Sequence, residues 1–140
     1  MATPQKFVLF PMGPKRFAFA AQEVAELAKP DTLHSFPHRT PLLSGVLLRR
    51  GNIVPVLDMA QVVIGPEAPS RKFYLIVKRK FERADELTAV PVTGECELTT
   101  AELLPPTGRL PGYVCGLLSL HDEIVEVLDI EKVVIAGGAA

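Results

Sequence analysis

The strongest constraint on the fold is an internal repeat with a period of 71 residues. At this spacing residues 45–64 align with residues 116–135 without a gap, and ten of the twenty positions are identical. Each copy holds two apolar segments separated by a short turn, then an aspartate and a further short apolar segment. Identity at half of the consecutive positions indicates duplication of one structural unit. We therefore expect two similar β units of about seventy residues.

The first hairpin of the repeat lies in residues 45–59, which read GVLLRRGNIVPVLDM. Residues 46–50 and 53–58 predict two antiparallel strands joined by Gly51-Asn52, a pair that supplies the positive φ angles of a two-residue turn. Both faces of the second strand are apolar, so we expect cover on both sides. Pro55 cannot donate an amide hydrogen bond, which predicts a sheet edge or a bulge there.

Other apolar segments predict the remaining strands. These segments are residues 7–10, 16–20, 73–77, 88–92 and 95–98, with a closing hairpin at 113–120 and 123–130. Residues 22–27 are compatible with either one helical turn or a strand. The sequence Gly-Pro-Glu-Ala-Pro-Ser at 65–70 predicts a boundary between the copies. With about five short strands in each half, we expect two small barrels, subdomain 1 at about 5–66 and subdomain 2 at about 71–135.

Composition narrows the classes of function. The net charge of −1 gives no electrostatic reason for a nucleic acid or an acidic membrane surface as partner. The apolar runs are shorter than the roughly 20 residues of a membrane span, and residues 1–7 lack the apolar core of a signal peptide. The two cysteines fit a reduced compartment better than a disulfide framework. We expect a cytoplasmic, mostly β protein without direct membrane insertion.

The repeated acids Asp58 and Asp129 are the first candidates for chemistry. Each follows a predicted strand and precedes a short apolar segment. A carboxylate at the start of a helical turn accepts hydrogen bonds from free backbone amides. We interpret both residues as helix caps.

Histidines and cysteines are the candidate metal ligands. His34 and His38 are four residues apart but lie in a proline-rich connection without a nearby cysteine or carboxylate. Cys96 and Cys115 lack CxxC spacing. No GxSxG, HExxH or glycine-rich phosphate motif is present. We expect no metal, no cofactor and no catalytic residues.

Arg49-Arg50 stands out, because the pair flanks a tight turn amid apolar residues. A solvated hairpin end and an anchor for a partner protein are equally compatible with it. Adjacent strand residues face opposite sides, so only one of the two arginines is expected to face a given partner.

The hairpin resembles the signature of CheW-like chemotaxis coupling domains, in which Gly-Val-x-Asn-Leu-Arg-Gly precedes an Ile-Val-Pro-Val-Leu-Asp-Leu strand. The similarity runs from about Phe7 to Val134. It includes Phe-Ala-Phe-Ala at 17–20, the step from Val24 to Glu26, and the closing stretch GLLSLHDEIVEVLDIEKVV.

This resemblance implies an all-β fold, with two five-stranded SH3-like β-barrels and short helical turns in a single CheW-like domain over residues 1–140. It also implies a non-catalytic adaptor without cofactors. Such adaptors join the cytoplasmic tips of chemoreceptors (methyl-accepting chemotaxis proteins) to the regulatory domain of the histidine kinase CheA, and they work at receptor arrays.

In the family the receptor contact involves the hairpin arginine, the glycine that opens the strand, and the Val-x-Glu step. Here the resemblance places these roles on Arg50, Gly45, Val24 and Glu26. We expect Gly45 to let a partner helix approach the strand closely, because a side chain there would stand in the way.

The kinase contact of the family is largely apolar, and the resemblance points to Leu27 and to the Pro55 strand. The chain departs from the family pattern at Leu48, where asparagine is usual, at Arg49, where leucine is usual, and at Thr93, where aspartate is common. Two alternatives remain. One is an accessory coupling protein that binds receptors but not the kinase. The other, less favoured, is a tandem small-barrel nucleic-acid binder, which would need a basic face with exposed aromatic residues.

Overall fold

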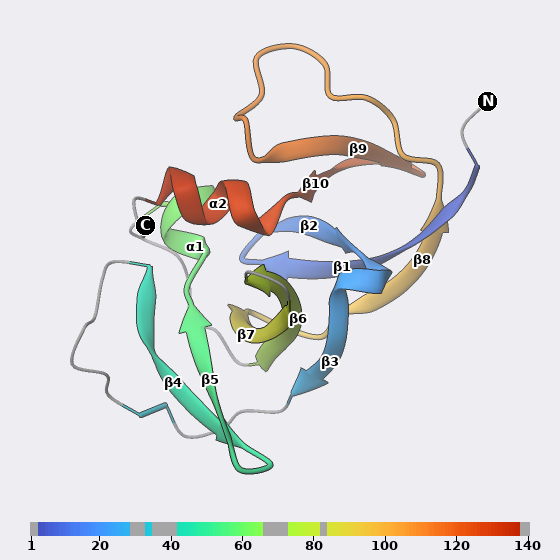
Figure 1. Cartoon of the computed structure of the whole chain (residues 1–140). Helices are drawn as coiled ribbons and strands as arrows, with labels where there is room; N and C mark the ends of the chain where they lie inside the picture. The colour runs from blue at the N-terminus through green and yellow to red at the C-terminus, as the bar shows by residue number, and fades with distance from the viewer. Residues whose placement is uncertain (1–2, 29–32, 35–41, 66–72, 82–83, 138–140) are drawn as a thin grey trace.

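The structure is a computed structural model of residues 1–140, and it describes residues 3–28, 33–34, 42–65, 73–81 and 84–137 (Figure 1). Ten strands dominate it. In chain order the elements are β1 (Gln5–Met12), β2 (Lys15–Ala20), the 3-10 helix η1 (Ala21–Glu23), β3 (Val24–Ala28), β4 (Leu43–Arg49), β5 (Asn52–Leu57), α1 (Ala60–Val63), β6 (Phe73–Phe81), β7 (Ala84–Val92), β8 (Glu97–Ala101), β9 (Val114–Leu120), β10 (Glu123–Leu128) and α2 (Ile130–Ala136). The all-β class is confirmed, and the ambiguous residues 22–27 form mostly strand β3.

The strands form two five-stranded sheets. Sheet 1 has the order β8-β1-β2-β10-β9, and sheet 2 has the order β3-β6-β7-β5-β4. Each sheet therefore combines strands from both halves of the sequence. This differs from the expected division at about 5–66 and 71–135, in which each half would form its own barrel. The hairpin β1–β2 lies in the sheet that contains β8, β9 and β10, while β6–β7 completes the sheet of β3, β4 and β5.

The exchange of hairpins is reciprocal. In sheet 2, Val56 of β5 pairs in parallel with Ala89 of β7. In sheet 1, Val127 of β10 pairs in parallel with Ala18 of β2. Val127 lies 71 residues after Val56, and Ala89 lies 71 residues after Ala18. The two sheets are thus built by the same rule from the two copies, which confirms the duplication inferred from the sequence.

The two hairpins have matching registers and matching irregularities. Leu47 pairs with Val54 in the first hairpin, and Leu118 pairs with Val125 at the equivalent place in the second. The turn of the first hairpin is shifted by one residue from the prediction. Arg49 pairs with Asn52, so the turn residues are Arg50 and Gly51, with φ angles of 51° and 80°. A two-residue turn of this kind needs positive φ at both central positions, and Asn52 instead begins the return strand.

Pro55 was predicted to lie at a sheet edge or a bulge. It lies at neither, because β5 sits between β7 and β4 and the register shift of this hairpin falls between Leu43 and Gly45. Its partner across β4 is Val46, whose N–H and C=O both bond to His34 on the other side. Val46 and Pro55 therefore form a non-hydrogen-bonded pair, where a missing amide hydrogen costs nothing. On the β7 side the ladder has a single pair, whereas the equivalent ladder between β10 and β2 has two.

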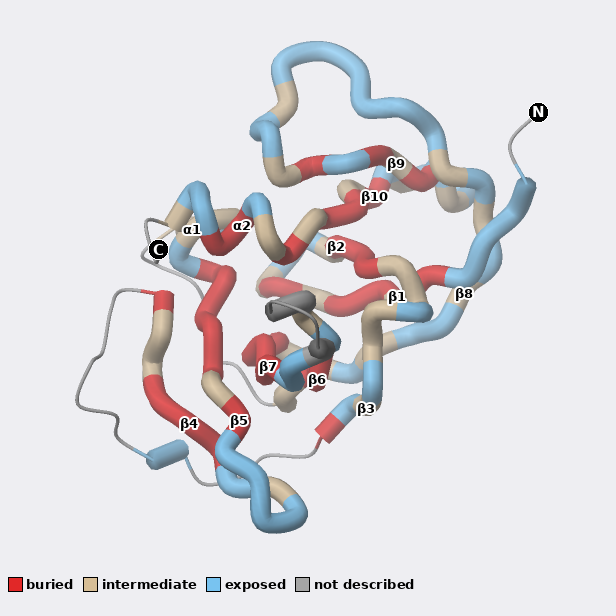
Figure 2. The backbone as a smooth tube through the Cα atoms, in the orientation of Figure 1, coloured by how far each residue is buried: buried red, intermediate tan, exposed pale blue. Residues whose placement is uncertain are grey.

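Three apolar cores hold the fold together. One lies within each sheet: Phe7, Leu9, Ala18, Leu118, Val125 and Val127 in sheet 1, and Ala28, Leu47, Val54, Val56, Ile76 and Ala89 in sheet 2. The third and largest joins the two sheets and both helices, and includes the stacked rings of Phe10 and Phe19 with centroids 4.9 Å apart. In Figure 2 the buried segments follow the strand centres, while the hairpin tip between β4 and β5 is exposed.

The predicted cap at Asp129 is confirmed, whereas the N-cap position of α1 is Met59 and Asp58 precedes it. The side chain of Asp129 accepts hydrogen bonds from the amides of Glu131 and Lys132 at the start of α2. Asp58 accepts one from the amide of Ala60 at 3.3 Å, at the start of α1. Among the described residues, no helix is long and apolar enough to cross a membrane.

Candidate partner-binding site

The tip of the β4–β5 hairpin, defined here as residues 48–53, projects from sheet 2 (Figure 1). Arg50 lies at its end with a side chain that is 82% exposed. The tight turn fixes the backbone from which the Arg50 guanidinium extends. A left-handed backbone at an arginine is uncommon and costs free energy, which is typical of positions retained for function.

Glu26 of β3 lies beside both arginines of the hairpin. Its Oε2 atom is 3.1 Å from Nη2 of Arg49 and 3.9 Å from Nη2 of Arg50. Since β3 and β4 are the two end strands in the order of sheet 2, the ion pair between Glu26 and Arg49 links the two ends of the sheet. In sheet 1 the edge strands β8 and β9 contact each other directly.

The expectation that the two arginines face opposite sides is wrong. Arg49 ends the strand, whereas Arg50 occupies the turn, so strand alternation does not extend to the second residue. Both guanidiniums lie on the side of Glu26. They differ in burial, because the Arg49 side chain is only 22% exposed. Arg49 has a structural contact and Arg50 presents its charge to solvent.

Gly45 has a different role from the one predicted. A Cβ atom built on it would lie 2.5 Å from the backbone oxygen of His34 and 2.7 Å from Cδ1 of Leu33. The space beside this glycine is thus filled by the chain itself and not left for a partner. Gly116 repeats the arrangement, with Leu103 and the backbone oxygen of Leu104 in the same places. In both copies a short segment pairs with the strand through backbone hydrogen bonds. His34 pairs with Val46 of β4, and Leu104 pairs with Leu117 of β9.

The structure brings together only part of the predicted receptor set. Glu26 and Arg50 are in contact, whereas Gly45 lies five residues before Arg50, about 17 Å along an extended strand. Val24 is half-buried and packs against the core between the sheets. Of the predicted kinase residues, Leu27 on β3 is 41% exposed and Pro55 on β5 is half-buried.

Sequence reasoning missed an apolar pair at the hairpin tip. Leu48 and Ile53 are directly opposite each other across β4 and β5, and they are 55% and 68% exposed. Alternation along the strands indicates that this pair is exposed, since Leu47 and Val54 of the next pair are buried. The pair was missed because both faces of the second strand are apolar, so the sequence does not distinguish the exposed face from the buried one.

The thiols have no sign of reactivity. Burial raises the pKa of Cys96 to about 11. Burial, together with Asp129 and Glu23, raises the pKa of Cys115. Among the described residues, no three His, Cys, Asp or Glu side chains are grouped closely enough to hold a metal ion. His38 lies outside the described residues.

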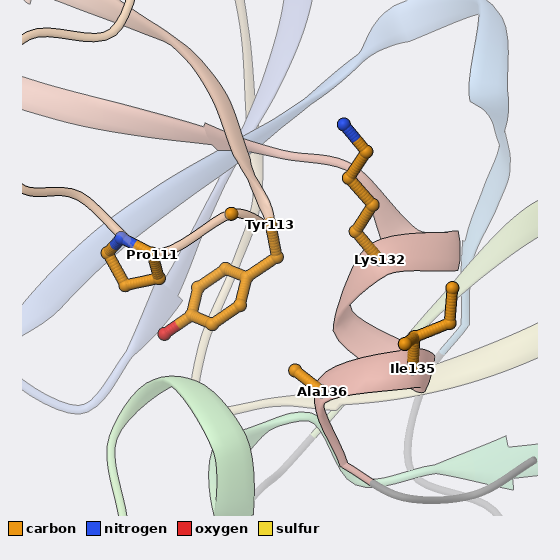
Figure 3. A pocket seen from close by; sticks show the side chains of 6 residues that line it. Pro111, Tyr113, Lys132, Ile135 and Ala136 are labelled. Carbon is orange, nitrogen blue, oxygen red and sulfur yellow. The ribbon is translucent and has the colours of Figure 1, made fainter.

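An open apolar hollow of about 450 Å³ lies between α2 and the segment before β9 (Figure 3). Pro111, Gly112, Tyr113, Lys132, Ile135 and Ala136 line it. Burial and Glu126 raise the pKa of the Tyr113 hydroxyl. These residues provide no pair of nucleophile and base for catalysis.

Two five-stranded sheets present an exposed hairpin tip with charged and apolar side chains, an arrangement typical of a protein-binding scaffold. Comparison with known proteins gives the family. The sequence matches the family model described as CheW-like domain over residues 6–136. The chain therefore belongs to the CheW-like domain family and is a chemotaxis coupling adaptor.

Similar proteins agree with this family. The chain is 20% identical over 133 residues to a probable chemotaxis protein CheW of Rhizobium etli, which covers 91% of this chain and 85% of that protein. It is 27% identical over 105 residues to protein FrzA of Myxococcus xanthus, covering 73% and 64% of the two chains. The crystal structure of the scaffolding protein TtCheW from Thermoanaerobacter tengcongensis has the same fold. Its TM-score is 0.77 at 18% identity, over 93% of this chain and 87% of that one.

Proposed function

We propose that this adaptor joins the cytoplasmic tip of a chemoreceptor to the regulatory domain of the histidine kinase CheA, without catalytic activity of its own. It acts in the cytoplasm, associated with receptor arrays. The observation that carries the receptor half is the contact between Glu26 and the exposed Arg50 at a rigid hairpin tip. Arginine on an ordered turn loses little backbone entropy on docking, and its planar guanidinium can form a two-pronged contact with a carboxylate.

The proposed receptor surface consists of Arg50 and Glu26. Val24 supports the surface from the core, and Gly45 acts indirectly by holding the segment at Leu33 against β4. Titration of a receptor tip fragment tests this proposal. Arg50→Ala should weaken binding about thirtyfold, as for an interface hot spot, and Arg50→Lys should restore part of the loss. Unchanged affinity in both variants would remove Arg50 from the receptor surface.

The proposed kinase surface is the exposed side of β3 at Leu27, together with the Pro55 strand. An apolar side chain that is 41% exposed on an edge strand supports it. Leu27→Ser should weaken binding of the CheA regulatory domain. Leu98→Ser is the matched control, because Leu98 is the repeat-related residue on β8 and is 63% exposed.

The same titrations distinguish the proposed receptor–kinase adaptor from the alternative of an accessory coupling protein. A protein that binds the receptor tip but not the CheA regulatory domain would be an accessory coupling protein. A salt-titrated measurement with single-stranded nucleic acid is the control for the remaining class, and we expect no binding given the net charge of −1.

A further inference from the structure

The hollow between α2 and the segment before β9 lies outside the proposed receptor and kinase surfaces. Its volume of about 450 Å³ falls in the range of about 300–1,000 Å³ that is typical of sites for small ligands. Such sites have a mostly apolar lining with a few polar groups that orient the ligand. This hollow has the same composition, because only Tyr113 and Lys132 among its lining residues carry a polar side-chain group.

One wall of the hollow is a single face of α2. Lys132, Ile135 and Ala136 are three and four positions apart, so they are neighbours on the helix surface, while the two valines between them are buried. Ile135 is 74% exposed, the largest exposed fraction among the large hydrophobic residues that the structure describes. Figure 3 shows the ring of Tyr113 on one side of the hollow and these three side chains on the other. An apolar chain could therefore pack between an aromatic ring and an exposed aliphatic side chain.

The repeat-related place beside α1 lacks this combination. Gln61 stands 71 residues before Lys132, and Leu42 stands in the place of Tyr113, where it is buried. The cation and the aromatic wall therefore belong to the second copy alone.

Lys132 brings an uncompensated positive charge to the hollow. Two other cations of this region have carboxylate partners. Nη2 of Arg79 lies 2.8 Å from Oε1 of Glu131, and Nζ of Lys15 lies 2.7 Å from Oε2 of Glu126. Within the part of the chain that the structure describes, Lys132 has no ion pair with a carboxylate. A ligand of complementary charge would bring a carboxylate to this ammonium group.

We propose that the hollow binds a small monocarboxylate with an apolar chain, of the short fatty-acid class. The chain packs between Tyr113 and Ile135, and the carboxylate lies at the ammonium group of Lys132. Because the hollow is open and the ligand is small, we expect a dissociation constant on the order of 1 mM. This inference goes beyond the proposed function and does not depend on it.

The test uses hexanoate as the probe, titrated into the isotope-labelled full chain and followed by amide chemical shifts. Concentration-dependent shifts are expected at Gly112, Tyr113 and the residues of α2. Hexanol has the same apolar chain without the charge, and it should bind about threefold more weakly or worse. Equal affinities for hexanoate and hexanol would overturn the carboxylate contact.

Two variants test the two contacts separately. Lys132→Gln introduces the residue of the first copy, and it should weaken hexanoate binding about threefold without an effect on hexanol. Ile135→Ser should weaken binding of both probes about threefold, because it removes apolar contact area. Both side chains are exposed, so melting curves should match that of the unmodified protein.

Matched controls are Lys6→Gln and Ile124→Ser. Lys6 is an exposed lysine of β1, and Ile124 is 58% exposed on β10. Both controls should leave the two affinities unchanged. Shifts that persist equally in Lys132→Gln and Ile135→Ser would show adventitious binding and overturn the site.

The remaining outcomes distinguish a small ligand from a protein partner. Absence of hexanoate-dependent shifts at the hollow would overturn the proposal. If the receptor tip fragment or the CheA regulatory domain perturbs the same amides while hexanoate does not, the hollow is a protein contact and the small-ligand assignment is wrong. Titrations of the unmodified protein with the receptor tip, in the absence of hexanoate, test the proposed function independently.

Discussion

Nη2 of Arg49 lies 3.1 Å from Oε2 of Glu26, and this ion pair joins the two edge strands of one sheet. Arg49 stands where the repeat-related residue is Leu120, which packs into the core of the other sheet. The same strand position therefore stabilises one barrel by apolar contact and the other by an ion pair. Arg49 of β4 thus fixes the position of Glu26 on β3.

Arg49→Ala should lower the free energy of unfolding by about 1 kcal/mol, through loss of the half-buried ion pair and of packing along the side chain. Arg50→Ala should change it by less than about 0.5 kcal/mol, because the side chain is solvent-exposed. Urea unfolding of both variants beside the unmodified protein measures the difference. A loss below about 0.5 kcal/mol in Arg49→Ala would mean that Arg49 has no structural role.

Arg50→Asn should separate folding from binding. Asparagine tolerates the left-handed backbone of this turn better than arginine, so the variant should gain about 0.5–1 kcal/mol of stability. It should still lose receptor affinity, because the guanidinium is gone. His121→Asn is the matched control, since His121 also has a positive φ, and should gain stability without loss of binding. The measurements are melting curves and receptor-tip titrations. A loss of stability in Arg50→Asn would contradict the turn argument.

Gly45→Ala should destabilise the fold by about 1–3 kcal/mol, because the new methyl group would press on the backbone of His34. Gly116→Ala should also destabilise, but less, since the nearest backbone atom there, the oxygen of Leu104, would lie 2.9 Å from the Cβ and the closer side chain of Leu103 can move. Gly112→Ala is the control, with no atom close to a Cβ at that position. Chemical unfolding of the three variants tests this order. A binding defect in Gly45→Ala without loss of stability would restore the glycine to a direct contact role.

Glu23→Gln should stabilise the protein at pH 7. Burial, and to a smaller extent Asp129 and Glu131, raise the pKa of Glu23 in the folded state above its ordinary value of 4.5. Between that ordinary value and the raised one, the folded state binds more protons than the unfolded state, so stability falls as the pH rises. In Glu23→Gln the free energy of unfolding should lack this contribution to the fall with rising pH. Urea unfolding from pH 4 to pH 7 measures it, and parallel pH profiles for the two proteins would show that Glu23 does not contribute.

Purified, tag-free protein should contain no stoichiometric zinc bound by His34, His38, Cys96 or Cys115. Zinc binds the thiolate form of cysteine. The pKa values of both thiols are raised, which favours the protonated form. Elemental analysis and melting curves with and without a chelator measure this. Stoichiometric zinc that disappears when these residues are replaced would disprove it.

Local features of the fold were predictable from the sequence because they depend on neighbouring residues. Alternation of apolar side chains, turn chemistry and the aspartate caps located both hairpins and both short helices. The turn prediction was wrong by one residue because both Gly51-Asn52 and Arg50-Gly51 contain a glycine. Side-chain preference favoured the former pair, while strand pairing in the folded protein selected the latter.

The exchange of hairpins between the halves was not predictable in this way. In a duplicated sequence, β2 and β7 carry the same apolar pattern, so β10 can bury the same side chains against either strand. Only the geometry of the connections decides between them. The role of Gly45 was missed for a related reason. The atoms that fill the space of its missing side chain belong to Leu33 and His34, twelve and eleven residues away, and no sequence pattern indicates this contact.

The reciprocal exchange of hairpins has a consequence for synthesis on the ribosome. The hairpin β1–β2 is translated before the rest, yet its sheet neighbours are β8 and β10, whose paired residues follow roughly ninety to a hundred and ten positions later. Until those strands emerge, Phe7 and Leu9 have no completed core to enter. Contacts so distant in sequence slow folding and leave apolar surface open to wrong associations. The sheet that contains β1–β2 can therefore be completed only after the last strand has been made.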